Sequence, residues 1–315
     1  MSEHDTDTID PDATGGDDRH EDGRGDIPAR QLDFEIDGPL EIDIAVGAGH
    51  IKVQFVDQPG ARVEIRHDQT AGDQWVPGLS SLLSWVSGQF GGPQEGSPED
   101  AVHQSRVDLV GSRLVIRNPK APALRGVPLD VLVRAPSGSH LGVKSGSARL
   151  VTSGRAGRLH ITSGTGDITV DRADGMATVA CASATVRLGP MPGGARIKTG
   201  AGDIDISSIG APSMLFSGTG DVWLGAVQAD LMVRTASGDI TVADAARGTV
   251  ELATGSGELQ VAVRKGATAM VDLKSHSGQA TSELEVTETP PSDEPALRIR
   301  GRTGSGNATI TRAAG

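Results

Sequence analysis

A column of acidic side chains is the most regular chemical feature of this 315-residue sequence. Each acid follows a glycine, at multiples of 18 residues and finally after 19: Asp167, Asp203, Asp221, Asp239 and Glu258. Stacked carboxylates could hold a row of cations, because carboxylate oxygens are preferred ligands of calcium. Alternatively, each side chain accepts hydrogen bonds from the backbone N–H groups of its own turn. Arg149, Thr185 and Asn307 interrupt the column, so we expect turn capping and no metal site.

The other residues with reactive side chains form no catalytic pattern. The single cysteine, Cys181, falls in a column that otherwise holds Ser163, Thr199, Ser217 and Thr235. We interpret Cys181 as a small inward-facing side chain, because no histidine or acid recurs beside it to activate a nucleophile. The eight histidines lack metal-ligand spacing, and Gly-x-Gly elements recur at nearly every turn, which marks them as turn structure. We therefore expect no enzyme, no catalytic residue and no cofactor.

One apolar group breaks the pattern of outward-facing residues. Met214, Phe216 and Met232 fall in outward columns of neighbouring units, and Trp223 lies on the next strand of the same unit. Cationic residues share these columns, namely Arg196, Lys198 and Arg234. An apolar cluster with a cationic rim is typical of a protein-interaction surface, so we predict contact with an unknown protein partner. The alternative is that a helix inserted elsewhere in the chain, or an irregular strand, covers the cluster.

These residues are carried by a repeat of about 18 residues. The segment Ser163-Gly-Thr-Gly-Asp-Ile-Thr-Val170 recurs, for example, as Ser217-Gly-Thr-Gly-Asp-Val-Trp-Leu224. Apolar residues keep the same register in three columns: Ile161, Val179, Ile197, Leu215 and Val233; Ile168, Val186, Ile204, Val222 and Ile240; and Val170, Leu188, Ile206, Leu224 and Val242. One unit cannot bury its own apolar face, so units must stack. We predict an all-β fold, a single-stranded β-helix or β-solenoid with about 18 residues per coil.

The repeat also predicts the domain organisation. The solenoid domain spans residues 30–315, with a regular array over 143–315 in which Gly257, Gly278 and Gly306 continue the glycine series at wider intervals. Before it, 106–117 reads as a hairpin. A short helical insertion is expected over 71–105, where one apolar face is formed by Trp75, Val76, Leu79, Leu82, Leu83, Val86 and Phe90. Such a helix near the N-terminal end is suited to covering the first coils. Ser97-Pro-Glu-Asp100 predicts the cap and first turn of another short helix.

Charge and composition narrow the classes of partner. The net charge is −12, and residues 1–28 contribute −8 of it through ten acids and two arginines. We expect an acidic, disordered tail over residues 1–29. Nucleic-acid binding is not expected, because the remaining chain has no run of basic residues. The sequence shows no leader and no membrane-spanning stretch, so a cytoplasmic location is expected.

The repeat and the run before it resemble a known family. Pro128-Leu-Asp-Val-Leu-Val-Arg-Ala-Pro-Ser-Gly-Ser-His-Leu-Gly-Val-Lys-Ser-Gly-Ser147, followed by Ser/Thr-Gly-x-Gly-Asp-Ile-x-Val units, resembles the bacterial putative-adhesin family of β-strand-repeat proteins, a domain of unknown function. The resemblance covers about residues 31–313 and implies a β-helix with a non-enzymatic, adhesive role. Two functions are therefore expected: a binding or scaffold module that uses one solenoid face, or a structural protein that forms homo-oligomers by end-to-end stacking.

Overall fold

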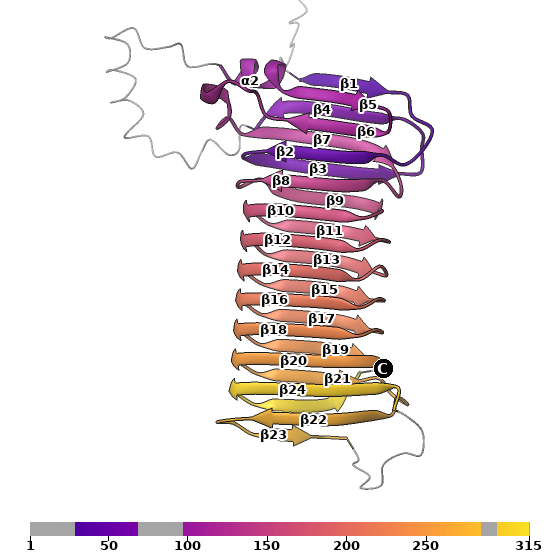
Figure 1. Cartoon of the computed structure of the whole chain (residues 1–315), viewed down its shortest axis with the longest axis vertical. Coiled ribbons are helices and arrows are strands. Elements are labelled where there is room, and N and C mark those ends of the chain that lie inside the picture. The colour runs from indigo at the N-terminus through magenta and orange to yellow at the C-terminus, as the bar shows by residue number, and fades with distance from the viewer. Residues whose placement is uncertain (1–28, 69–96, 285–294, 315) are drawn as a thin grey trace, which may run out of the picture.

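The fold consists of two long β-sheets that face each other along the long axis of the molecule (Figure 1). The computed structural model describes residues 29–68, 97–284 and 295–314. Sheet A has 13 strands and sheet B has 12. The prediction of an all-β fold is confirmed, and most neighbouring strands pair in parallel. No helix in these three ranges is long and apolar enough to cross a membrane.

The middle of the molecule is a regular array in which the chain alternates between the two sheets. Sheet B takes β8 (His140–Ser145), β10 (Leu159–Thr165), β12 (Ala177–Ser183), β14 (Ala195–Ala201), β16 (Ser213–Thr219), β18 (Leu231–Ser237) and β20 (Gly248–Ser256). Sheet A takes β9 (Arg149–Ala156), β11 (Ile168–Ala173), β13 (Val186–Met191), β15 (Ile204–Ile209), β17 (Val222–Val227), β19 (Ile240–Ala245) and β21 (Leu259–Val263). Neighbouring strands of one sheet are parallel, and Ile161 pairs with Val179, which pairs with Ile197.

The core lies between the two sheets and is almost entirely aliphatic. The inward columns on sheet B, from Ile161 to Val233, and on sheet A, from Ile168 to Ile240, are at most 1% exposed. Side chains alternate between the two faces of a strand, so the residues between these columns point outward. β-Branched residues suit such extended strands, and each packs against another aliphatic residue one coil away. The molecule therefore has two outer faces, one on sheet A and one on sheet B, with the core between them.

The turns that close the coils require glycine for two reasons, which Gly238 illustrates. Its φ angle is +138°, a conformation that side-chain-bearing residues rarely adopt. A Cβ atom at this position would also lie 2.1 Å from the carbonyl oxygen of Gly220, one coil away. Most coils therefore keep glycine at this turn position, and Ala148 and Ala184 are the exceptions.

The N-terminal end departs from the regular pattern. In sheet A, β7 (Leu129–Pro136) pairs with β3 (Gly49–Val56) in parallel, and with β4 (Ala61–His67) antiparallel, beyond which lies β1 (Arg30–Phe34). In sheet B, β2 (Glu41–Val46) lies between β8 and the hairpin of β5 (Arg106–Val110) and β6 (Arg113–Arg117). A short 3-10 helix, η2 (Pro122–Leu124), follows this hairpin. The hairpin predicted over 106–117 is present.

The segment predicted as a helical insertion contains one described helix, α2 (Pro98–Gln104). The Ser97 side chain accepts a hydrogen bond from the Asp100 backbone N–H, and the Asp100 side chain accepts one from the Ser97 N–H. This capping box begins the helix where the sequence motif predicts it. The longer apolar helix predicted through Trp75 and Phe90, and residues 1–28 of the predicted acidic tail, lie outside the described residues.

The C-terminal end corrects the predicted order of the coils. Chain order places β22 (Ala269–Ser275) and β23 (Ala280–Ser282) before β24 (Leu297–Ser305) and β25 (Ala308–Arg312). In space, β24 lies between β20 and β22, and β25 lies between β21 and β23. A Cβ atom at Gly306 would meet the Gly257 carbonyl, and one at Gly278 would meet the Gly306 carbonyl. The prediction that Gly278 follows Gly257 directly is therefore wrong, because the last coil inserts between them.

Candidate interaction surface

The acidic column joins successive coils through backbone hydrogen bonds. Asp203 Oδ1 accepts from the Asp221 N–H at 2.9 Å, and Asp221 Oδ1 accepts from the Asp239 N–H at 2.9 Å. Asp239 Oδ1 then accepts from the Glu258 N–H at 2.7 Å. The prediction that each acid caps its own turn is wrong for these three residues, because parallel, in-register stacking brings the N–H of the next coil within reach instead.

The same column shows that a side-chain oxygen without a negative charge can also accept the bond between coils. Asn307 occupies the turn position of the last inserted coil, and its Oδ1 accepts from the Gln279 N–H at 3.1 Å. Arg149, which interrupts the column, pairs instead with Asp167 at 3.4 Å. Within the described ranges, no three His, Cys, Asp or Glu side chains are placed to hold a metal ion. In the structure, the column connects neighbouring coils by hydrogen bonds.

Cys181 lies inward, in a column of hydroxyl groups. The Ser163 and Thr199 hydroxyls donate to the carbonyl two residues further on, at 2.7 and 2.8 Å. Ser217 and Thr235 repeat this bond. Burial raises the pKa of the Cys181 thiol, which the Thr199 side chain opposes in part. A thiol whose pKa is raised is a weaker nucleophile at neutral pH, because less of it is thiolate.

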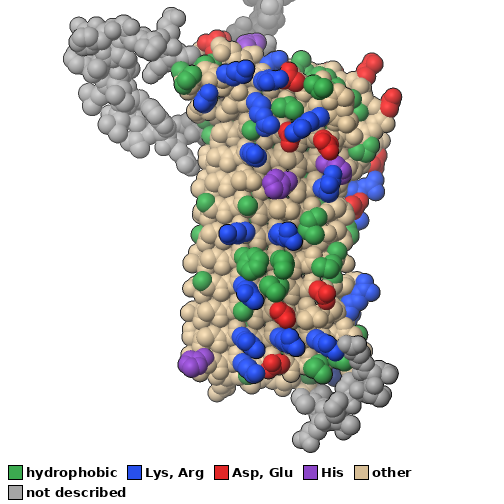
Figure 2. Space-filling model, in the orientation of Figure 1, with side chains coloured by type: hydrophobic (Ala, Val, Ile, Leu, Met, Phe, Trp, Pro, Cys, Tyr) green, Lys and Arg blue, Asp and Glu red, His purple; other side chains and the backbone are tan. Residues whose placement is uncertain are grey.

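The outer face of sheet B carries three of the four predicted site residues. Met214 of β16 pairs in register with Met232 of β18, and this pair is flanked by Arg196 of β14 and Glu251 of β20. Phe216 lies two residues beyond Met214 on the same outer face. Met214 is 39% exposed, whereas the inward Leu215 beside it is fully buried. Figure 2 shows hydrophobic side chains gathered midway along this face, with Lys and Arg side chains on both sides of them.

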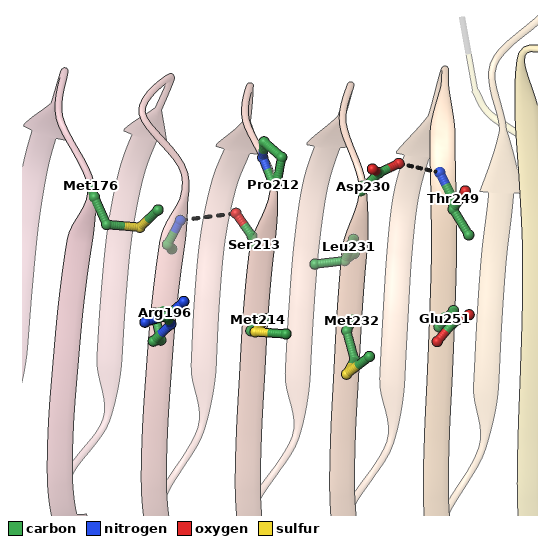
Figure 3. Close-up of a pocket in the computed structure, with 11 residues that line it drawn as sticks. Met176, Arg196, Pro212, Ser213, Met214, Asp230, Leu231, Met232, Thr249 and Glu251 are labelled. Atoms are coloured by element: carbon green, nitrogen blue, oxygen red, sulfur yellow. Dashed lines mark hydrogen bonds between the residues drawn. The ribbon is translucent and has the colours of Figure 1, made fainter.

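A groove of about 480 Å³ opens at these methionines. Besides Met214 and Met232 it is lined by Met176, Ala195, Arg196, Pro212, Ser213, Asp230, Leu231, Thr249 and Glu251 (Figure 3). We call this site the methionine groove. Its polar edge is held by bonds between coils: the Ser213 hydroxyl accepts from the Ala195 N–H at 2.9 Å, and Asp230 Oδ1 accepts from the Thr249 N–H at 2.8 Å. The groove is therefore a fixed feature of the stacked strands.

Met176 was missed by the sequence analysis. It is 38% exposed and lies just before β12, where the alternation of inward and outward residues does not yet apply. Its column continues through Gly194 and Pro212 to Asp230 at intervals of 18 residues. Gly194 presents no side chain between Met176 and Pro212, which helps to leave the groove open. The residues of this turn column, compared one coil at a time, would have indicated Met176 as an outward-facing apolar residue.

Trp223 does not belong to the same surface. It is outward and 45% exposed, but β17 is a strand of sheet A, so its side chain stands on the opposite face of the solenoid from the methionines. Its register neighbours are Asp205 and Thr241. The prediction that all four residues form one cluster is therefore wrong for Trp223, because the turn after β16 carries the chain into the other sheet.

The comparisons with known proteins identify the family. Residues 129–311, more than half of the chain, match the family described as Toastrack DUF4097. The chain belongs to this family. The resemblance predicted from the repeat is thereby confirmed, and the match covers the regular array that carries the methionine groove of this Toastrack chain.

Similar solved structures include a putative adhesin and a putative lipid binding protein. A putative adhesin from Bacteroides fragilis shares 14% identity over 90% of this chain and 96% of its own, with a TM-score of 0.39. A putative lipid binding protein from Parabacteroides distasonis shares 10% identity over 91% of this chain and 95% of its own, with a TM-score of 0.33. No curated protein matches the chain.

Proposed function

We propose that this chain is a non-catalytic binding module that contacts a protein partner through the methionine groove. The observation that carries the proposal is the break in the repeat at this point on sheet B. The outward column is polar on both sides, with Thr178 and Arg196 before it and Glu251 and Arg300 after it, but it becomes Met214 and Met232 in the middle.

These methionines are not needed by the core. Leu215 and Val233 fill the inward positions of the same strands and are fully buried. Methionine is flexible and polarizable, and it is favoured at surfaces that adapt to partner side chains. The alternative, in which the inserted helix covers the cluster, concerns the segment of Trp75 and Phe90, which lies outside the described residues; the described helix α2 packs on β4 and η2 at the N-terminal end.

A panel of short labelled peptides tests this proposal by fluorescence polarisation. The peptides combine leucine with serine, leucine with glutamate, leucine with lysine, or serine with glutamate. We expect at least one leucine-containing peptide to bind and this binding to be lost in the Met214→Ser/Met232→Ser variant. Trp223→Ser removes an equally exposed apolar side chain from sheet A and should bind like the wild type.

The proposal is contradicted if no leucine-containing peptide binds, or if Trp223→Ser loses binding as much as the double methionine variant does. Both variants change outward residues, and their melting curves establish that each remains folded before binding is compared.

A second candidate function is end-to-end assembly. Val271 of β22 pairs with the buried Ile299 and occupies an inward column, yet it is 36% exposed, because β22 is the edge strand of sheet B. An open strand edge with uncovered apolar residues is suited to pairing with another chain. Light scattering after size-exclusion chromatography tests this: mass should rise with concentration and fall in Val271→Lys, and a concentration-independent monomer would exclude assembly.

A further inference from the structure

A second groove on the outer face of sheet B adjoins the methionine groove. It measures about 440 Å³ and is lined by Val233, Arg234, Glu251, Leu252, Ala253, Arg300 and Arg302. We call it the arginine groove. Arg234 of β18 and Arg302 of β24 both pair in register with Ala253 of β20, which lies between them. Two strand spacings, or about 10 Å, therefore separate the backbones of the two arginines, and only a methyl group stands between their side chains.

The charges in the arginine groove are only partly balanced. Arg300 pairs with Glu251 at 3.5 Å. Within the described ranges, Arg234 and Arg302 have no ion-pair partner, so their guanidinium donors are available to an anion. Both arginines face outward from paired strands, so their charges lie on either side of the space above Ala253. Guanidinium groups bind carboxylates with paired N–H donors, so a carboxylate fits this arrangement.

The two grooves are close enough for one short segment to contact both. Arg234 follows Met232 by two residues on the same face of β18, a distance of about 7 Å along the strand. Arg234 also pairs in register with Phe216 of β16. Glu251 lines both grooves. A ligand that places an apolar group over the methionines thus brings its neighbouring groups to the arginines.

We propose that the partner presents an acidic peptide segment, whose carboxylates bind Arg234 and Arg302 while an adjacent apolar side chain enters the methionine groove. This inference rests on the proposed function and specifies the chemistry of the partner. A peptide fits better than an anionic membrane, because Asp230 and Glu251 line the methionine groove and would repel a continuous layer of phosphates. An extended peptide can place a carboxylate at the arginines and keep uncharged groups beside these acids.

The same peptide panel tests the inference, with variants of the arginine groove. The leucine–glutamate peptide should bind more tightly than the leucine–serine and leucine–lysine peptides, and the advantage should shrink as salt is raised. Arg234→Gln and Arg302→Gln should each weaken binding of the leucine–glutamate peptide about two- to fivefold, the range of exposed charge pairs. Neither should change binding of the leucine–serine peptide. Arg187→Gln, on the outer face of sheet A, is the matched control and should have no effect.

The outcomes separate this inference from the proposed function. Equal affinities for the glutamate and serine versions of the leucine peptide would overturn the acidic partner and leave the methionine groove in place. If no leucine-containing peptide bound the wild-type protein, the proposed function itself would be overturned. Phosphatidylglycerol vesicles that bind with the same dependence on Arg234 and Arg302, while the peptides do not bind, would replace the peptide with a membrane surface.

Discussion

The Gly-Asp turns and the outer face of sheet B belong to the same coils but follow opposite rules. At the Gly-Asp turns, most residues one coil apart are alike, because each packs directly on the next: Gly220 stacks on Gly238, and Asp221 Oδ1 accepts a hydrogen bond from the Asp239 N–H. On the outer face, neighbours differ, and Lys198, Phe216 and Arg234 succeed one another in register. Residues that repeat from coil to coil are those that stabilise the solenoid. Residues that depart from the repeat are not needed for stacking and are the candidates for binding.

The largest effect is expected at a stacked turn. Gly238→Ala should lower the free energy of unfolding by about 2 kcal/mol or more, because it combines an unfavourable positive φ with a backbone collision at the Gly220 carbonyl. Gly266→Ala is the matched control: its φ is +83°, but no atom lies within 4 Å of the added Cβ. Urea denaturation should show the smaller loss for Gly266→Ala, and equal losses would refute the role of stacking.

The acidic column should show a moderate effect that depends on an oxygen acceptor. Asp221→Ala removes the acceptor of the Asp239 N–H and should cost about 1 kcal/mol of unfolding free energy. Asp221→Asn keeps an acceptor, as Asn307 does, and should be close to neutral. If both variants lost the same stability in urea denaturation, the negative charge and not the hydrogen bond would be the stabilising feature.

A smaller effect is expected at Cys181, where the change is mainly in reactivity. Because the pKa of the thiol is raised in the folded chain, its thiolate forms only at higher pH than in the unfolded chain. A disulfide reagent should therefore label the native protein much more slowly than the urea-unfolded protein at mildly alkaline pH. The raised pKa also predicts that stability falls as pH rises through the thiol pKa, and that Cys181→Ser abolishes this fall. Equal labelling rates would contradict the buried position.

The smallest effect is expected from calcium. Three carboxylates of the acidic column, those of Asp203, Asp221 and Asp239, already accept backbone hydrogen bonds between coils, so adding millimolar calcium or a chelator should leave the melting temperature unchanged. A melting temperature that rises with calcium and falls again with chelator would show that the column binds cations as well as N–H groups.

The regular parts of the fold can be predicted from the sequence, because residues one repeat apart in the chain also stack on each other in space. The columns of Ile161 and Ile168 identify the core, and alternation along β16 correctly turns Met214 and Phe216 outward. The order of the C-terminal coils could not be predicted, since the insertion of β24 next to β20 depends on contacts between distant segments. Trp223 is separated from the methionines because its strand belongs to the other sheet. The spacing of the repeat does not show which sheet each strand joins, so this separation could not be predicted.

The methionine methyl groups provide the most direct test of the central claim. The chain has six methionines, among them Met176, Met214 and Met232 at the groove, the fully buried Met191 and the exposed Met270 on β22. In a methyl NMR titration of isotope-labelled protein with the leucine–glutamate peptide, the three groove signals should shift while those of Met191 and Met270 stay in place. Shifts confined to Met270, or no shift at all at the groove, would contradict a binding function for the outer face of sheet B.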